Sequence, residues 1–137
     1  MAHTQLEIKN ATVKAAVGAG TLADFADAID NVKLQTAYTT TRWNGVSGKS
    51  AVTATPLKDT IVVNVGDSLK TGEFWAMLRA NHGLAGKVEF CPLGGTSPKI
   101  AADVLLVAPG ALGGAEGGNS STITLECLAP ATITYAP

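Results

Sequence analysis

The sequence predicts a mainly β protein that carries one α-helix near the middle of the chain. Residues 59–65 and 121–127 alternate apolar and polar side chains, which is typical of half-buried strands. Residues 71–82 instead place apolar side chains at helical spacing. The composition agrees, because sixteen threonines and eleven valines among 137 residues favour strands. We expect a single domain over residues 1–137, with a core built mainly from Val, Ile and Leu because only 5% of the residues are aromatic.

The N-terminal part should contribute two strands separated by a compact turn. Residues 5–14 predict a strand with a bulge midway, where the apolar side chains change face. Residues 21–31 place three apolar side chains at helical spacing, so a short helix or a tight turn is expected there. Residues 32–42 are rich in β-branched residues and predict the next strand. The glycines of residues 44–49 then predict a mobile loop that continues to about the next proline.

The central helix has the clearest start and end signals. Thr71 can cap its N-terminus, and Gly83 can end it. Phe74, Met77 and Leu78 form an apolar stripe with Trp75 at its edge, so about 16 Å of helix should lie across a sheet.

The C-terminal half should contain four further strands. Residues 86–92 and 121–127 fit half-buried strands, and residues 131–135 fit a short final one. Residues 100–107 are nearly apolar on both faces, which is expected within a packed layer or at a subunit contact. Five glycines in residues 110–118 predict a flexible connection.

Charge and cysteine content exclude several function classes. The formal net charge of −1 argues against tight nucleic-acid binding, which requires a positive field. No stretch approaches the roughly 20 apolar residues of a membrane span, and no leader sequence is expected. Cys91 and Cys127 cannot form a zinc site by themselves. Two free thiols are the preferred interpretation, and a disulfide remains an alternative if their strands are neighbours.

Two glycine-rich segments resemble nucleotide-binding motifs only superficially. Residues 43–50 (WNGVSGKS) end like a P-loop, but Trp43 occupies the place of the opening glycine. Residues 51–56 cannot form the helix that the motif requires, so a solvated loop explains the segment better. The glycines of residues 110–118 also lack the strand and helix that flank a dinucleotide site.

The titratable residues give no catalytic pattern. Asp24, Asp27 and Asp30 would line one side of a short helix, where they could attract a cation. Calcium loops need ligands at alternate positions and a glycine turn, so a solvated polar face is preferred. His3 and His82 have no acid–base partner in the sequence, and no Ser or Cys lies in a nucleophile turn. We therefore expect no enzymatic activity, no cofactor and no metal.

The order of elements is the most specific feature of the chain. Its parts are Pro56-Leu57-Lys58-Asp59 leading a strand, Gly66-Asp67 before the helix, a strand ending at Pro92, the apolar strand 100–107, the glycine-rich connection 113–121 and the closing strand 122–127. This order resembles the major tail proteins, or tail-tube proteins, of long-tailed (siphovirus-type) bacteriophages. Residues 128–130 depart from the pattern, because the family would place a glycine turn there.

The resemblance implies a structural virion protein. It implies two packed antiparallel sheets, a β-sandwich or partial barrel with one flanking helix, and self-assembly into hexameric rings that stack into a tail tube. Such a tube is a conduit for DNA during ejection, without specific DNA binding. The other implied partners are tail proteins such as the tape measure, terminator and distal tail proteins. The subunit would be made in the host cytoplasm and would reside in the virion, not in a membrane.

The resemblance also assigns provisional roles to residues. The candidate loop between subunits or rings comprises Asn44, Gly45, Val46, Ser47, Gly48 and Lys49. Asp24, Asp27 and Asp30 would face either the lumen or the solvent.

Two other structural classes remain as alternatives. One is a capsid decoration (cement) protein, which binds a preformed shell and should not polymerise alone; the other is a different component of a phage tail or tail-like tube. A carbohydrate-binding sandwich is disfavoured, because most of the seven aromatic residues are expected to lie inside.

Overall fold

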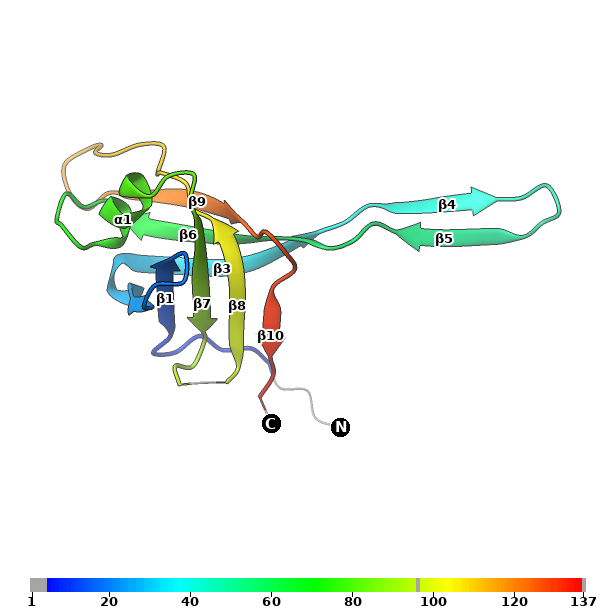
Figure 1. Ribbon diagram of the computed structural model, residues 1–137, viewed down its shortest axis with the longest axis horizontal. Coiled ribbons are helices and arrows are strands. Elements are labelled where there is room, and N and C mark those ends of the chain that lie inside the picture. Colours follow the sequence, from blue (N-terminus) through cyan, green and yellow to red (C-terminus); the bar gives the residue numbers. More distant parts are fainter. Residues whose placement is uncertain (1–4, 96, 137) are drawn as a thin grey trace.

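The protein has a mainly β fold built from antiparallel sheets of five, three and two strands (Figure 1). The computed structural model describes residues 5–95 and 97–136. Within these ranges there is one short α-helix, and no sheet closes into a barrel. The mainly β class and the mid-chain helix are therefore confirmed.

The five-stranded sheet has the strand order β10-β8-β7-β1-β2. Its strands are β1 (Thr12–Val17), β2 (Ala23–Asp24), β7 (Ala85–Cys91), β8 (Lys99–Leu105) and β10 (Thr132–Thr134). Every neighbouring pair is antiparallel. Val13, Val88 and Val104 point to the buried face, as the alternation of side chains along a strand requires.

The three-stranded sheet places β6 (Lys58–Gly66) between β3 (Ile29–Ala37) and β9 (Ser120–Glu126). Along β6, Ile61, Val63 and Val65 are buried and alternate with more exposed residues. An isolated bridge between Val104 and Cys127 links the end of this sheet to the five-stranded sheet. The two sheets thus enclose one hydrophobic core.

Helix α1 (Phe74–Ala80) is shorter than predicted. Its seven residues span about 10 Å, because an α-helix rises 1.5 Å per residue. Thr71 is not the cap: Gly72 has a φ of +87°, and Glu73 takes the N-cap position without a side-chain hydrogen bond. Gly83, with a φ of +85°, lies in the turn that follows the helix and donates its N–H to the Leu106 carbonyl.

The buried face of α1 completes the core at one end of the sheets. Phe74, Trp75 and Leu78 are all buried, and the Phe74 ring lies 5.0 Å from the Phe25 ring. Leu78 is completely inaccessible to solvent. The helix therefore covers the core next to β6 and does not cross the whole width of a sheet.

One of the two N-terminal predictions requires correction, and the other is confirmed in its second alternative, a tight turn. Residues 5–11 contain no strand, and Asn10 adopts a left-handed conformation with a φ of 52° just before β1. Residues 21–31 form no α-helix but contain β2, a 3₁₀ turn (Ala26–Ala28) and the start of β3. Of the apolar side chains at helical spacing there, Phe25 and Ile29 pack against the core.

Candidate functional site

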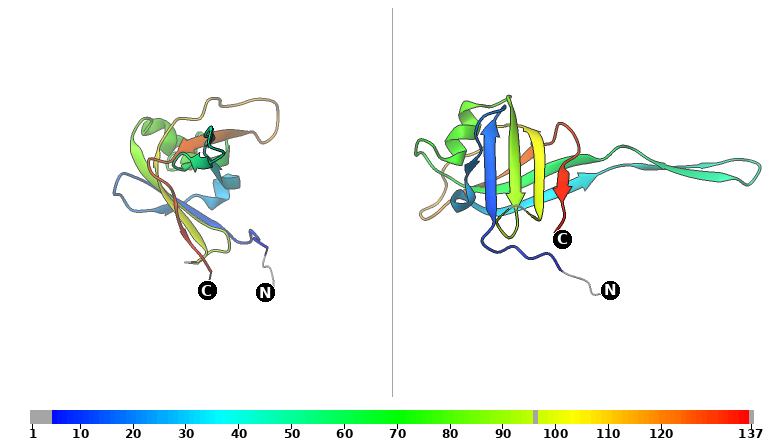
Figure 2. Two further views of the ribbon diagram at one scale, coloured as in Figure 1. Left: turned by 90° about the vertical axis from the view of Figure 1, so that its right-hand side faces the viewer. Right: turned by 60° about the horizontal axis from the view of Figure 1, so that its bottom comes forward.

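A two-stranded arm projects from the body of the molecule, as Figure 1 and the right-hand view of Figure 2 show. The arm, residues 38–57, contains β4 (Thr40–Asn44) and β5 (Ser50–Ala54), which pair only with each other. It extends the β3–β6 hairpin, whose last pair is Ala37 with Lys58. The prediction of a strand over 32–42 is confirmed except at residues 38–39, which separate β3 from β4. The prediction that the loop continues to Pro56 is wrong, because residues 50–54 form β5.

Sequence reasoning missed β5 because the arm buries no face against the core, so burial imposes no alternation of apolar and polar residues on its strands. One signal could have revealed it: two threonine-rich segments lie on either side of a short glycine-containing turn, which is a hairpin pattern. Their cross-strand pairs include Thr41 with Thr53 and Trp43 with Ala51. β-Branched residues in such pairs support a hairpin that no core covers.

The candidate loop 44–49 forms the turn at the tip of the arm. Asn44 ends β4, and the turn is closed by hydrogen bonds from the Gly45 N–H to the Lys49 carbonyl (2.7 Å) and from the Gly48 N–H to the Gly45 carbonyl (3.0 Å). Gly48 has a φ of +88°, which favours glycine. The Trp43 indole lies over Gly45, where an added Cβ would be 2.6 Å from the ring. The tip is thus a tight turn closed by backbone hydrogen bonds.

The surface of the arm is apolar and basic. Every residue from Gln35 to Lys58 is exposed except Gly45. The exposed large apolar side chains of the arm are Tyr38, Trp43, Val46, Val52 and Leu57. Its charged residues are Arg42 and Lys49, and it contains no Asp or Glu. Because apolar residues concentrated on one projection indicate contact with another surface, the arm is the leading candidate for an interface.

A buried carboxylate anchors the base of the arm. Asp59 is 7% exposed and accepts hydrogen bonds from the Thr36 hydroxyl (2.6 Å) and the Ala131 N–H (2.8 Å). Its backbone carbonyl accepts the Cys127 N–H at 3.1 Å. Asp59 therefore joins β3, the end of β9 and the segment before β10. Sequence analysis did not single it out, because its partners come from distant parts of the chain.

Both cysteines are free thiols, so no disulfide links them. Cys91 is buried and Cys127 is partly buried. Burial raises the pKa of the Cys127 thiol above its ordinary value of 9.0, and the nearby negative charge of Asp59 raises this pKa further. The thiol is therefore protonated at neutral pH and is a poor nucleophile there.

The three aspartates do not share one helix face. Asp24, on β2, accepts hydrogen bonds from the Ala26 N–H (3.0 Å) and the Val13 N–H (3.4 Å). Asp27 lies on the 3₁₀ turn, and Asp30, on β3, accepts a hydrogen bond from the Asn64 amide at 2.6 Å. All three residues are exposed. Within the described ranges, no group of three or more His, Cys, Asp or Glu residues is placed to hold a metal ion.

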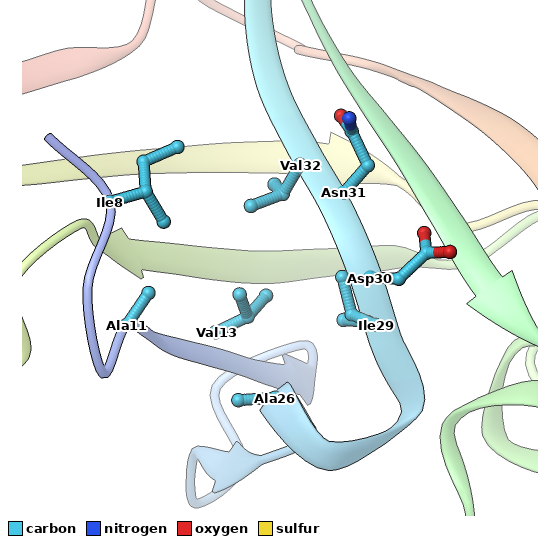
Figure 3. Close-up of a pocket in the computed structure, with 8 residues that line it drawn as sticks. All are labelled: Ile8, Ala11, Val13, Ala26, Ile29, Asp30, Asn31 and Val32. Carbon is cyan, nitrogen blue, oxygen red and sulfur yellow. The ribbon is translucent and has the colours of Figure 1, made fainter.

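A groove of about 410 Å³ lies between the N-terminal segment, β1 and β3 (Figure 3). Ile8, Val13 and Val32 are among its apolar lining residues, and Asp30 supplies its only titratable side chain. The Asp30 carboxylate and the Asn31 amide point away from the aliphatic side chains in Figure 3. The lining can bury apolar groups but offers no acid–base pair.

The segment that resembles a P-loop, residues 43–50, leads into strand β5 and is not followed by the helix that a P-loop requires.

Comparison with known proteins gives no independent assignment. No protein-family model matches the chain, and no curated protein matches it. Among the described residues, no helix is long and apolar enough to span a membrane.

Proposed function

We propose that this protein is a self-assembling structural subunit that forms stacked rings, and that these rings build the tail tube of a long-tailed bacteriophage. The observation that carries the proposal is the arm, whose apolar side chains find no cover within their own chain. A two-stranded hairpin that leaves a domain is only marginally stable in water by itself. Contact with other copies would bury its side chains and fix its position.

The free strand edges support the same proposal. In the described part of the chain, β3 pairs only with β6, while β4 and β5 pair only with each other. Unpaired edges recruit strands from other chains, which is a liability in a monomer and an advantage in an assembly. Two packed sheets with a helix at one end are also compatible with the tail-tube architecture that the order of elements suggests.

The charge distribution fits a conduit. The chain has ten basic and eleven acidic residues, and two of the basic residues but none of the acidic ones lie on the arm. The body is therefore acidic, and an acidic wall would repel DNA phosphates and let DNA pass without binding. No enzymatic step, cofactor or resident metal is part of this proposal.

Replacing the arm tests the proposal. In the variant, residues 38–57 become Asn-Gly, which can join the paired Ala37 and Lys58 as a two-residue hairpin loop. Because the removed segment contributes no buried side chain, the body should fold with the wild-type circular dichroism spectrum and a similar unfolding midpoint. Sedimentation and electron microscopy should show tubes from the wild type and only monomers from the variant.

The control is a second variant with an intact arm and one exposed substitution on the body, Asp103→Asn. It should assemble like the wild type. Tubes formed by the variant without the arm would refute the role of the arm. A wild type that binds only to preformed capsid shells, without tubes of its own, would favour a decoration protein.

A further inference from the structure

Residues 108–113, which begin the connection from β8 to β9, form a strap beside helix α1. A groove of about 490 Å³ lies between them, lined by residues 109–112 of the strap, by Trp75 and Arg79 of α1, and by Leu69. Figure 1 shows α1 and this connection at the same end of the molecule. Of the backbone N–H groups of residues 107–112, only that of Ala108 donates a hydrogen bond within the described ranges. The position of the strap therefore depends on bonds to side chains.

Two titratable side chains hold the ends of the strap. At one end, the Ala108 N–H donates to Nδ1 of His82, in the turn after α1, at 2.9 Å. At the other end, the Gly113 N–H donates to one carboxylate oxygen of Asp67 at 3.1 Å. The second oxygen of Asp67 accepts the Ser121 hydroxyl at 2.8 Å, which ties this end to β9 as well. The end at Ala108 has only the imidazole.

The bond to His82 exists only while the imidazole is neutral. Because Nδ1 accepts the Ala108 N–H, the proton of the neutral ring is on Nε2. A protonated imidazole carries hydrogen on both nitrogens and has no acceptor left. Histidine is the side chain whose charge ordinarily changes between about pH 5 and pH 8. His82 is exposed, so it can take up a proton without unfolding of the protein.

No neighbouring charge replaces the lost bond. The strap itself contains no charged residue. The charged residues on the adjoining elements are Arg79 on α1, Asp67, Lys70 and Glu73 before α1, Lys87 on β7 and Glu116 after the strap. Among the described residues, the only ion pair joins Lys99 and Glu89, so no carboxylate is paired with His82. A protonated His82 therefore gains no new partner that would keep the strap in place.

We propose that His82 is a pH-sensitive switch for the strap. When the imidazole takes up a proton, the Ala108 end is released while Asp67 keeps the Gly113 end fixed. The strap then moves away from α1, which widens the groove beside Trp75 and exposes Pro109, a buried residue in the closed state. This inference does not depend on the proposed assembly, and it gives the groove an access that changes with pH.

Hydrogen–deuterium exchange of the full-length protein, followed by mass spectrometry, tests the switch. His82→Asn places an oxygen acceptor near the position of Nδ1 but does not titrate, whereas His82→Ala removes the acceptor. At about pH 8, where histidine is neutral, the wild type and the Asn variant should protect residues 108–112 equally. The Ala variant should exchange there about twofold to tenfold faster, which corresponds to one net hydrogen bond. At about pH 5 the wild type should match the Ala variant, and the Asn variant should keep its protection.

Comparison of the three proteins at one pH cancels the intrinsic effect of pH on exchange. Strand β9 is the internal control and should exchange equally in all three at each pH. If the wild type and the Asn variant exchange equally at the acid pH, or if the Ala variant matches the wild type at the alkaline pH, His82 does not control the strap.

A second measurement needs no variant. In NMR spectra of the unassembled wild type, the Ala108 amide signal should shift with pH in step with the ring signals of His82. The Gly113 amide, which is bonded to Asp67, should not follow them. An Ala108 signal that moves no more than that of Gly113 would overturn the switch and leave the proposed function untouched.

Discussion

The buried carboxylate of Asp59 should hold the base of the arm to the body. It accepts two short hydrogen bonds, from the Thr36 hydroxyl and the Ala131 N–H. A hydrogen bond to a charged group contributes about 1.5–3 kcal/mol, so Asp59→Ala should lower the free energy of unfolding by about 3–6 kcal/mol. Asp59→Asn keeps one acceptor oxygen and should cost about 1–3 kcal/mol. The free energy of unfolding of a native domain is about 5–15 kcal/mol, so the Asn variant should still fold.

Urea unfolding followed by circular dichroism measures these differences. Asp103→Asn is the matched control, because Asp103 is exposed and its substitution should change stability by less than about 0.5 kcal/mol. Removal of the Asp59 charge should also lower the pKa of Cys127 toward its ordinary value and speed alkylation of this thiol at mildly alkaline pH. If Asp59→Asn matches the control in both measurements, the carboxylate does not anchor the arm.

Three further predictions concern the core and pH. Leu78→Ala, at a completely buried position, should cost about 2–5 kcal/mol in urea unfolding, and a loss below about 1 kcal/mol would mean that α1 is not packed on the core. Gly86→Ala should cost about 1–3 kcal/mol by the same assay, because the new Cβ would lie 2.7 Å from the Ala16 carbonyl oxygen; a neutral effect would show that the strands can separate. The raised pKa of Cys127 stabilises the fold fully below pH 9.0, the ordinary value, and this contribution is lost as pH rises through the folded-state pKa. Cys127→Ser should therefore lose less stability than the wild type between about pH 8 and pH 10.5, and equal losses would contradict the shift.

Strands that cover the core could be predicted from the sequence, because burial imposes alternation. Strand β6 lies within one residue of its predicted bounds at each end, and its buried Ile61 and Val63 carry the pattern. The arm obeys no such rule. Its strands are held by backbone pairing and β-branched side chains, so the threonine-rich segment was recognised as a strand but its partner was interpreted as a loop.

The start of the helix was predicted at the wrong residue, and the role of Asp59 was not predicted at all. The two errors have different reasons. Thr71 fits an N-cap by residue type, but Gly72 has a positive φ and the N-cap lies two residues later, at Glu73. Asp59 appeared in the sequence only as the polar start of a strand. Its role depends on Ala131, 72 positions away, and such a contact leaves no local pattern. The interface proposed for the arm likewise depends on a second copy, which no single chain displays.

Electron microscopy of the purified wild-type protein, fractionated by size over a series of increasing concentrations, tests self-assembly most directly. The heaviest fraction should contain hollow tubes of regularly stacked rings, with an axial repeat that is lost when the arm is removed. A protein that remains a single, uniform monomer at the highest concentration, with the arm exposed to solvent, would contradict the account.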